Sequence, residues 1–367
     1  MDFDFEGEPP LVLLGAGASK PAGLPLTAEM SEHMADPASS GPGAWDDTHL
    51  EPEDARVIRF VIGALQMRKG VENENPFSKV NVEDVFSSIE KLADRSRLQI
   101  SPFVNSWHEA VSDIEPVGRT DESNQSDFAD AAVRMEKELV NILWFEAGDN
   151  SVSYLRPMIE EVCINGGTIA TLNYDNSVEL SASNADIRCE TGFGRWVGRD
   201  QPTKSFEDAE LLKLHGSLNW RYNPHSRSVR DFEELSPTSE EKIYHSHPGR
   251  DSSERLGVIF GTGQKLQSEG PFLDILQEFR RRLHEHRRLI VIGYSFGDSH
   301  INYQIREWLE GVDGRKILII GGPKETFENH PLSVGVEQEF FAGTPLEKDQ
   351  VEFSSAGASK GISDLFA

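Results

Sequence analysis

The sequence contains few cysteines, no long apolar run and no basic start. Only Cys163 and Cys189 are cysteines among its 367 residues, too few for a disulfide framework or a four-cysteine zinc site. No apolar run approaches the ~20 residues that a membrane helix needs. The acidic start MDFDFE lacks the positive charge of a secretory segment. We therefore expect a cytoplasmic protein with reduced thiols and no membrane attachment.

Basic residues are also scarce. The chain has 36 Lys and Arg against 62 Asp and Glu, a net charge of −26. Because a nucleic-acid backbone is held by a basic surface, we expect no direct nucleic-acid binding. The basic stretch from Arg280 to Arg288 is interpreted as a solvated helix face that leads into a strand. His225, His245 and His247 lack regular ligand spacing, so we expect a polar loop there rather than a metal site.

Six short apolar segments predict buried strands: Leu11–Leu14, Gly167–Leu172, Leu211–His215, Leu256–Phe260, Leu289–Gly293 and Lys316–Ile320. They do not alternate in polarity, which is typical of strands buried on both faces. Helical patterns lie between several of them, including one that starts at Pro271 and one capped by Asp298. This alternation predicts an α/β fold with a parallel sheet and ligands at the carboxyl ends of its strands.

Residues 31–150 have a different pattern. Amphipathic helices are predicted at Val57–Met67, Val82–Leu92 and Ala131–Phe145. We interpret this region as a mostly helical insertion in one domain that spans residues 1–367, rather than as a separate module.

The first apolar strand runs into a glycine-rich turn, LVLLGAGASK, with Gly15, Gly17 and Ser19. Such a turn before a helix gathers backbone N–H groups and a helix N-terminus, which attract an anion such as a pyrophosphate. The third glycine of the dinucleotide fingerprint falls on Lys20, and no GxxxxGK[ST] loop is present. The turn therefore disfavours a hydride-transfer dehydrogenase, and by itself it leaves open nucleotide binding or a merely tight junction.

Three further predicted strands end in polar residues, in the segments TLNYD (171–175), LHG (214–216) and GYSFGDSHI (293–301). Each segment alone has a plain structural interpretation: Asn173 as a turn residue, His215 as a loop histidine and Asp298 as a helix cap. In a parallel sheet, however, all of them emerge at the same edge as the first turn.

The order GAGAS, TLNYD, LHG, GYSFGDSHI resembles the sirtuin family, and more closely the sirtuin-like domains of bacterial antiphage defence systems. The resemblance spans roughly residues 11 to 322 and implies a Rossmann-like parallel sheet with helices on both faces. It also implies that NAD+ is bound as a substrate. Its pyrophosphate would lie on Gly15, Ala16, Gly17 and Ser19.

The same resemblance implies the remaining roles. Asn173 would hold the nicotinamide ribose and the attacking water, and His215 would be the general base. Asp175 would meet the nicotinamide carboxamide. Gly293 and Ser295 would contact the adenosine side of the cofactor.

Departures from the sirtuin pattern affect the expected reaction. Deacylating sirtuins carry four zinc-bound cysteines, which this chain lacks, and Tyr174 stands where they have a small aliphatic residue. GLPLT replaces their Asp-Phe-Arg after the first turn. These differences weigh against deacylation and leave NAD+ cleavage, which needs no metal because the pyridinium is already a good leaving group. A neutral histidine can take the proton at cellular pH.

We therefore expect an NAD+ glycohydrolase that acts as a toxic effector in abortive infection by NAD+ depletion. Its trigger would be assembly as a homo-oligomer or a partner protein, and the resemblance suggests a DNA-translocase-type ATPase or a short Argonaute. Two alternatives remain: an NAD-dependent protein deacylase, and a non-catalytic module that senses NAD+ or ADP-ribose.

Overall fold

The computed structural model describes residues 7–37, 48–93, 127–196, 208–222, 232–236, 256–259, 270–312, 314–321 and 350–366. Its contacts divide the chain into two compact units. The sheet unit comprises residues 1–24, 143–259 and 266–367, and the helical unit comprises residues 25–142 and 260–265. Whether both form one domain with an insertion at about 31–150 stays a prediction. His225, His245 and His247 lie outside the described residues.

Within the described residues, the sheet unit is built on a seven-stranded sheet of order β10-β9-β8-β1-β2-β4-β3. Every pairing in it is parallel. The strands are β1 (Leu11–Leu14), β2 (Thr168–Thr171), β3 (Arg188–Glu190), β4 (Asp208–Lys213), β8 (Arg288–Ile292), β9 (Lys316–Ile320) and β10 (Val351–Ser354). The order reverses beside β1, which has β2 on one side and β8 on the other, as in Rossmann-like folds. The predicted fold class is confirmed.

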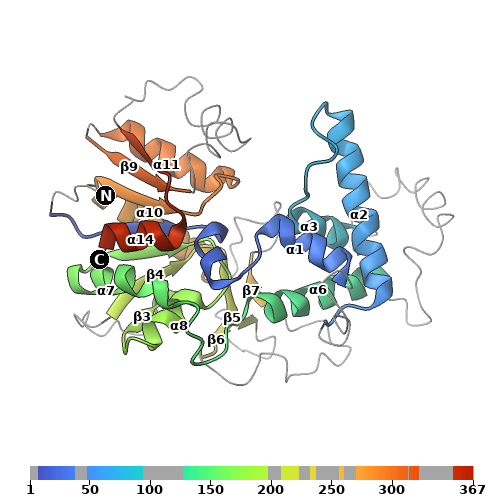
Figure 1. Cartoon of the computed structure of the whole chain (residues 1–367), viewed down its shortest axis with the longest axis horizontal. Coiled ribbons are helices and arrows are strands. Elements are labelled where there is room, and N and C mark those ends of the chain that lie inside the picture. The colour runs from blue at the N-terminus through green and yellow to red at the C-terminus, as the bar shows by residue number, and fades with distance from the viewer. Residues whose placement is uncertain are drawn as a thin grey trace. The chain divides into compact units, whose positions relative to one another are not determined.

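Helices cover both faces of this sheet (Figure 1). Leu13 and Val291 point to the face that packs against Phe279 and Trp308 in one continuous core. The other face is covered by α7 and α14, which contact each other. The helices of this unit are α7 (Arg156–Asn165), α8 (Ser177–Ser183), α9 (Phe193–Trp196), α10 (Phe272–Glu285), α11 (Ser299–Gly311) and α14 (Ala358–Phe366), with 3₁₀ turns at Ala16–Ala18, Lys20–Ala22 and Ser153–Leu155.

One predicted strand belongs to a different sheet. The segment predicted at Leu256–Phe260 forms β7 (Leu256–Val258), which pairs antiparallel with β5 (Gly216–Tyr222). With β6 (Phe232–Glu234) these strands form a small three-stranded sheet. Strand β7 (LGV) is short and apolar like the strands of the main sheet, so composition alone did not separate it from them. Phe260 lies outside the described residues.

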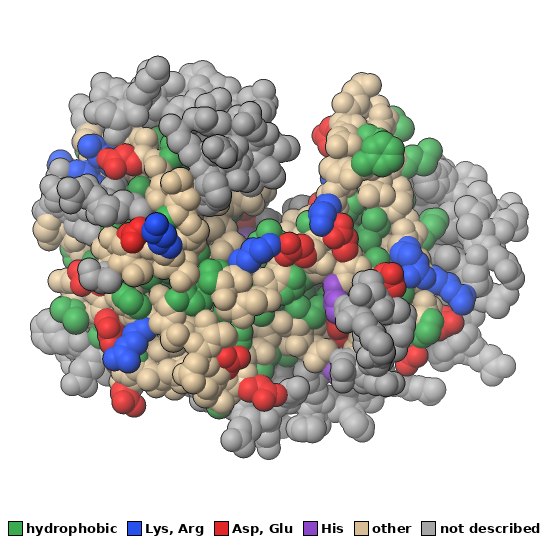
Figure 2. Space-filling model, in the orientation of Figure 1, with side chains coloured by type: hydrophobic (Ala, Val, Ile, Leu, Met, Phe, Trp, Pro, Cys, Tyr) green, Lys and Arg blue, Asp and Glu red, His purple; other side chains and the backbone are tan. Residues whose placement is uncertain are grey.

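The helical unit contains α1 (Thr27–Ala35), α2 (Pro52–Val71), α3 (Val82–Ala93) and α6 (Asp127–Leu143, whose last residue is assigned to the sheet unit). The three predicted helices are confirmed. The first three helices pack on one another, because each presents an apolar side. Met67, Val71 and Phe77 are exposed near the C-terminal end of α2, where Figure 2 shows hydrophobic side chains on the surface. None of the helices that the structure describes is long and apolar enough to cross a membrane.

Candidate functional site

Segments that follow four strands meet at the carboxyl edge of the main sheet. The turn after β1 is joined to the turn after β8, because Gly17 N donates to Gly293 O at 2.8 Å. The same first turn is joined to the segment after β2 by Asn173 Nδ2, which donates to Gly15 O at 3.0 Å. The edge predicted from the sequence is therefore assembled within the sheet unit.

The first turn differs from its prediction. Strand β1 is followed by two 3₁₀ turns, and the first α-helix starts only at Thr27, so no α-helix N-terminus follows the glycines directly. The N–H groups of Gly15, Gly17, Ala18 and Ser19 donate to backbone carbonyls of the protein. These N–H groups therefore already have acceptors within the protein. The argument that a helix N-terminus binds an anion at this turn does not hold.

Close contact between two turns explains the glycines. A Cβ on Gly15 would lie 2.5 Å from Tyr294 Cα, and one on Gly17 would lie 2.9 Å from Gly293 Cα. A Cβ on Gly293, which has φ +65°, would lie 2.1 Å from Ala18 N. The turns after β1 and β8 therefore pack backbone to backbone, which residues with a side chain would prevent.

A chain of hydrogen bonds links Ser19, Asn173 and Asp175. The Ser19 hydroxyl donates to Asp175 Oδ2 at 2.9 Å and lies 3.0 Å from Asn173 Nδ2, which donates to it. Asp175 Oδ1 accepts from Ser177 N at 3.0 Å. Asn173 gives amide hydrogens to two fixed acceptors, so the orientation of its side chain is set and Oδ1 is its acceptor atom.

A buried lysine is hydrogen-bonded to the backbone of Asp175. Lys213, the last residue of β4, is fully buried and donates to Asp175 O at 2.5 Å. It also lies 3.0 Å from the buried carboxylate of Glu179. Burial raises the pKa of Glu179, while the nearby lysine lowers it. Sequence analysis missed this pair, although a lysine inside the apolar run LLKLHG was a visible signal.

Tyr154 contacts the first turn. Its hydroxyl donates to Ala18 O at 2.5 Å. Burial raises the pKa of Tyr154, and the negative charge of Asp175 raises it further. The hydroxyl therefore stays protonated and acts as a donor.

His215 lies in a sharp turn between β4 and β5. Gly216 has φ +85°, and a Cβ there would lie 2.0 Å from Gly257 O, which explains the glycine after the histidine. Ile259 N donates to His215 O at 2.8 Å, and the Tyr174 hydroxyl donates to Ile259 O at 2.9 Å. The ring of His215 is buried with 7% of the residue exposed.

The direct partner of His215 is a residue predicted only as a helix cap. His215 Nε2 lies 2.8 Å from Asp298 Oδ2, and Asp298 is also buried. Asp298 caps α11 as predicted, through its other carboxylate oxygen. Ser295 lies exposed on the loop between β8 and α11. The structure thus joins Ser19, Asn173 and Asp175 directly, and it joins His215 to Asp298.

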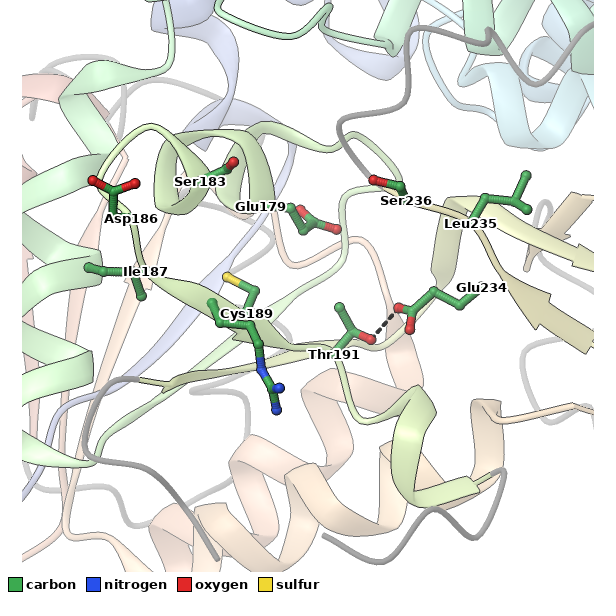
Figure 3. Close-up of a pocket in the computed structure, with 10 residues that line it drawn as sticks. Glu179, Ser183, Asp186, Ile187, Cys189, Thr191, Glu234, Leu235 and Ser236 are labelled. Carbon is green, nitrogen blue, oxygen red and sulfur yellow. Dashed lines mark hydrogen bonds between the residues drawn. The ribbon is translucent and has the colours of Figure 1, made fainter. Parts of the chain in front are cut away.

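A cavity of about 480 Å³ is lined by residues of α8, of β3 and of the end of β6 (Figure 3). Glu179, Cys189 and Glu234 are among its lining residues, and Thr191 donates to Glu234. None of the site residues predicted from the sequence lines it. Burial raises the pKa of Cys189, so this thiol stays protonated. No group of three or more His, Cys, Asp or Glu side chains in the described ranges is arranged to hold a metal ion.

Comparison with known families gives a match. The model of the SIR2-like domain matches residues 167–337. This segment contains Asn173, Asp175, His215 and the loop from Gly293 to Asp298, but not the first turn. The predicted resemblance to sirtuins is confirmed at the level of this domain. No curated protein matches the sequence.

Solved sirtuin structures have a similar arrangement at low sequence identity. A Sir2 homologue in complex with NAD is 13% identical, with 97% of this chain and 87% of that chain covered and a TM-score of 0.41. A Sir2 complex with a p53 peptide and NAD+ and Sir2Tm bound to a propionylated peptide are each 12% identical, with 97% and 90% covered and TM-scores of 0.40. At such scores the fold assignment depends on this chain's own sheet order.

Proposed function

We propose that this chain is an NAD+ glycohydrolase that releases nicotinamide and ADP-ribose. The observation that carries the proposal is the fixed side chain of Asn173, held by Gly15 O and Ser19 Oγ at the edge where the buried His215 also lies. The SIR2-like match includes both residues. Relatives solved with NAD support the choice of substrate.

The chemistry needs few protein groups. Nicotinamide leaves the ribose C1′ as a neutral molecule, so the glycosidic bond breaks without an acid. In the proposed reaction Asn173 Oδ1 accepts a hydrogen bond from water, whose oxygen bonds to C1′. His215 takes the proton of that water. Asp175 receives the nicotinamide carboxamide, and Gly15, Ala16, Gly17, Ser19, Gly293 and Ser295 contact the rest of NAD+.

The small number of cysteines favours hydrolysis over deacylation. Cys163 is buried in α7 and Cys189 lies in β3, and two thiols cannot supply the four zinc ligands of the sirtuin module. Deacylation of a lysine peptide is the alternative, because Sir2Tm was solved with a propionylated peptide. A sensor that binds NAD+ or ADP-ribose without turnover is the second alternative.

The proposal extends to biology through the resemblance alone. Constant NAD+ loss would kill the cell, so the activity requires a trigger. We place the chain in the cytoplasm as the effector of an antiphage system. Assembly as a homo-oligomer, or a partner of the DNA-translocase ATPase or short Argonaute type, would switch it on.

Nicotinamide release from NAD+ by the purified chain tests the activity. We expect Asn173→Ala and His215→Ala to lower kcat by at least about 100-fold, because each removes a group that acts on the reacting water. Asn165→Ala and His300→Ala are matched controls at exposed positions of α7 and α11 and should leave the rate unchanged.

Other products distinguish the alternatives. O-acyl-ADP-ribose formed with an acetyl-lysine peptide, at a rate above that of simple hydrolysis, would identify a deacylase. NAD+ binding without turnover, with or without co-expressed partners, and unchanged in Asn173→Ala, would identify a sensor and refute the hydrolase.

A further inference from the structure

Asp298 uses its two carboxylate oxygens for different tasks. Oδ1 accepts hydrogen bonds from His300 N at 2.9 Å and Ile301 N at 3.4 Å, which caps α11. Oδ2 lies 2.8 Å from His215 Nε2. A cap needs only one oxygen, which serine, threonine or asparagine could supply equally well. Capping therefore leaves the second oxygen, and the negative charge, unexplained.

The backbone around Asp298 is held firmly. Phe296 has φ +56°, a left-handed conformation that is costly for an aromatic residue. Asn302 Nδ2 donates to Phe296 O at 2.6 Å, and Asp298 N donates to the Tyr294 hydroxyl at 3.1 Å. Tyr294, Asn302 and Asp298 are all buried. Strained turns persist where surrounding contacts fix them, and this one fixes the carboxylate that faces His215.

We propose that Asp298 is the positioning residue for His215. Its carboxylate accepts a hydrogen bond from His215 Nε2–H, so the neutral ring carries its proton on Nε2 and its lone pair on Nδ1. In the proposed hydrolysis, Nδ1 then takes the proton of the attacking water, and the Asp298 carboxylate stabilises the imidazolium that forms. The catalytic half rests on the proposed function, whereas the tautomer is a property of the protein alone.

Asparagine at position 298 separates this role from capping. In Asp298→Asn the side-chain oxygen can still cap α11, but the amide presents N–H to Nε2. The ring must then carry its proton on Nδ1 and loses its base at that atom. A comparable reversal in a Ser-His-Asp triad lowers kcat about 10⁴-fold. We expect a loss of about 10³-fold or more in kcat with a small change in KM.

Two measurements on the full-length chain test the proposal. Nitrogen-15 NMR of the histidine rings, at a pH where the imidazole is neutral, reports which nitrogen is protonated, and His215→Gln assigns the signal. NAD+ turnover is measured on the same samples. Asp298→Ser is the second variant, because serine keeps the cap and has no second oxygen for the histidine. It should fold and lose most of the rate without reversing the tautomer.

The expected result is Nε2–H in the wild type, Nδ1–H in Asp298→Asn, and a large drop in kcat in both variants. A wild-type ring protonated on Nδ1 would overturn the proposal. So would full turnover by either folded variant. If the wild type shows the Nε2–H tautomer but never cleaves NAD+, the orienting role of Asp298 is supported and the proposed function fails separately.

Discussion

Buried carboxylates bridge a backbone N–H and a basic side chain in both units of the molecule. In the helical unit, Asp54 accepts hydrogen bonds from Glu51 N at 2.7 Å and Arg134 Nη1 at 2.9 Å. In the sheet unit, Asp298 caps α11 and lies 2.8 Å from His215 Nε2. Arg134 belongs to another helix, so its pair ties α2 to α6. The basic partner of Asp298 lies at the candidate site.

The comparison indicates that the same arrangement, a buried carboxylate between a backbone N–H and a basic side chain, serves two purposes. Between helices it joins two elements, and at the sheet edge its proposed role is to orient His215. Substitutions in the helical unit should therefore change stability, whereas conservative substitutions at Asp298 or Asn173 should change activity with a small effect on folding.

Lys213→Met should cause the largest loss of stability. It is an exception to the expectation that substitutions at the sheet edge mainly change activity. Lys213 lies at the sheet edge, yet it is fully buried and is the basic partner of the buried Glu179. Its removal leaves a buried carboxylate without its countercharge, which costs about 3–5 kcal/mol. Burial already raises the pKa of Glu179, so this carboxyl takes up a proton as the pH falls and the loss should shrink. Hydrogen exchange of sheet-unit peptides at several pH values measures this loss of stability.

Arg134→Met is the matched control for Lys213→Met in the helical unit. Its side chain is 34% exposed, and Asp54 keeps the hydrogen bond from Glu51 N. Such a partly exposed pair contributes about 1 kcal/mol or less. Equal losses of stability in the two variants would show that the burial of Lys213 does not increase the cost of removing it.

A pair of glycines sharpens the comparison between units. Gly293→Ala should destabilise the sheet unit by about 3 kcal/mol, because a Cβ would meet Ala18 N at 2.1 Å and φ is +65°. Gly63 is exposed within α2 and a Cβ there meets nothing within 4 Å. Gly63→Ala should therefore stabilise the helical unit by about 0.5–1 kcal/mol. Unit-resolved hydrogen exchange measures both, and a stable Gly293→Ala protein would contradict the packing of the two turns.

The sequence predicted the sheet better than the site. Strands such as Leu289–Gly293 were recognisable because a strand buried on both faces must be a short apolar run. The carboxyl edge followed from parallel connectivity. By contrast, the pairing of His215 with Asp298 joins residues 83 positions apart. It depends on the turn through Phe296, which no local pattern encodes.

The first turn shows the opposite limit of sequence analysis. Its glycines were recognised, but their physical reason was not, because the space that they leave is filled by the turn after β8. A glycine pattern reports that backbone must come close to something, and only the fold identifies whether that is a ligand or another strand's turn.

Glu138→Gln should give a small effect that depends on pH. Burial alone would raise the pKa of Glu138, but hydrogen bonds from His33, from His49 N and from Thr48 outweigh it and lower the pKa below 4.5. A lowered pKa means that the ionised carboxylate stabilises the folded state. That contribution is complete above pH 4.5 and is lost as the pH falls through the folded-state pKa.

Exchange of helical-unit peptides at pH 6 and near pH 3 therefore tests the role of this carboxylate. The variant should be less stable than the wild type by about 1 kcal/mol at the higher pH, and the difference should shrink at the lower pH. Glu53→Gln on the exposed side of α2 is the control and should show no such trend. A constant difference at both pH values would mean that shape or packing, rather than the charge of Glu138, holds His33 and residues 48–49 in place.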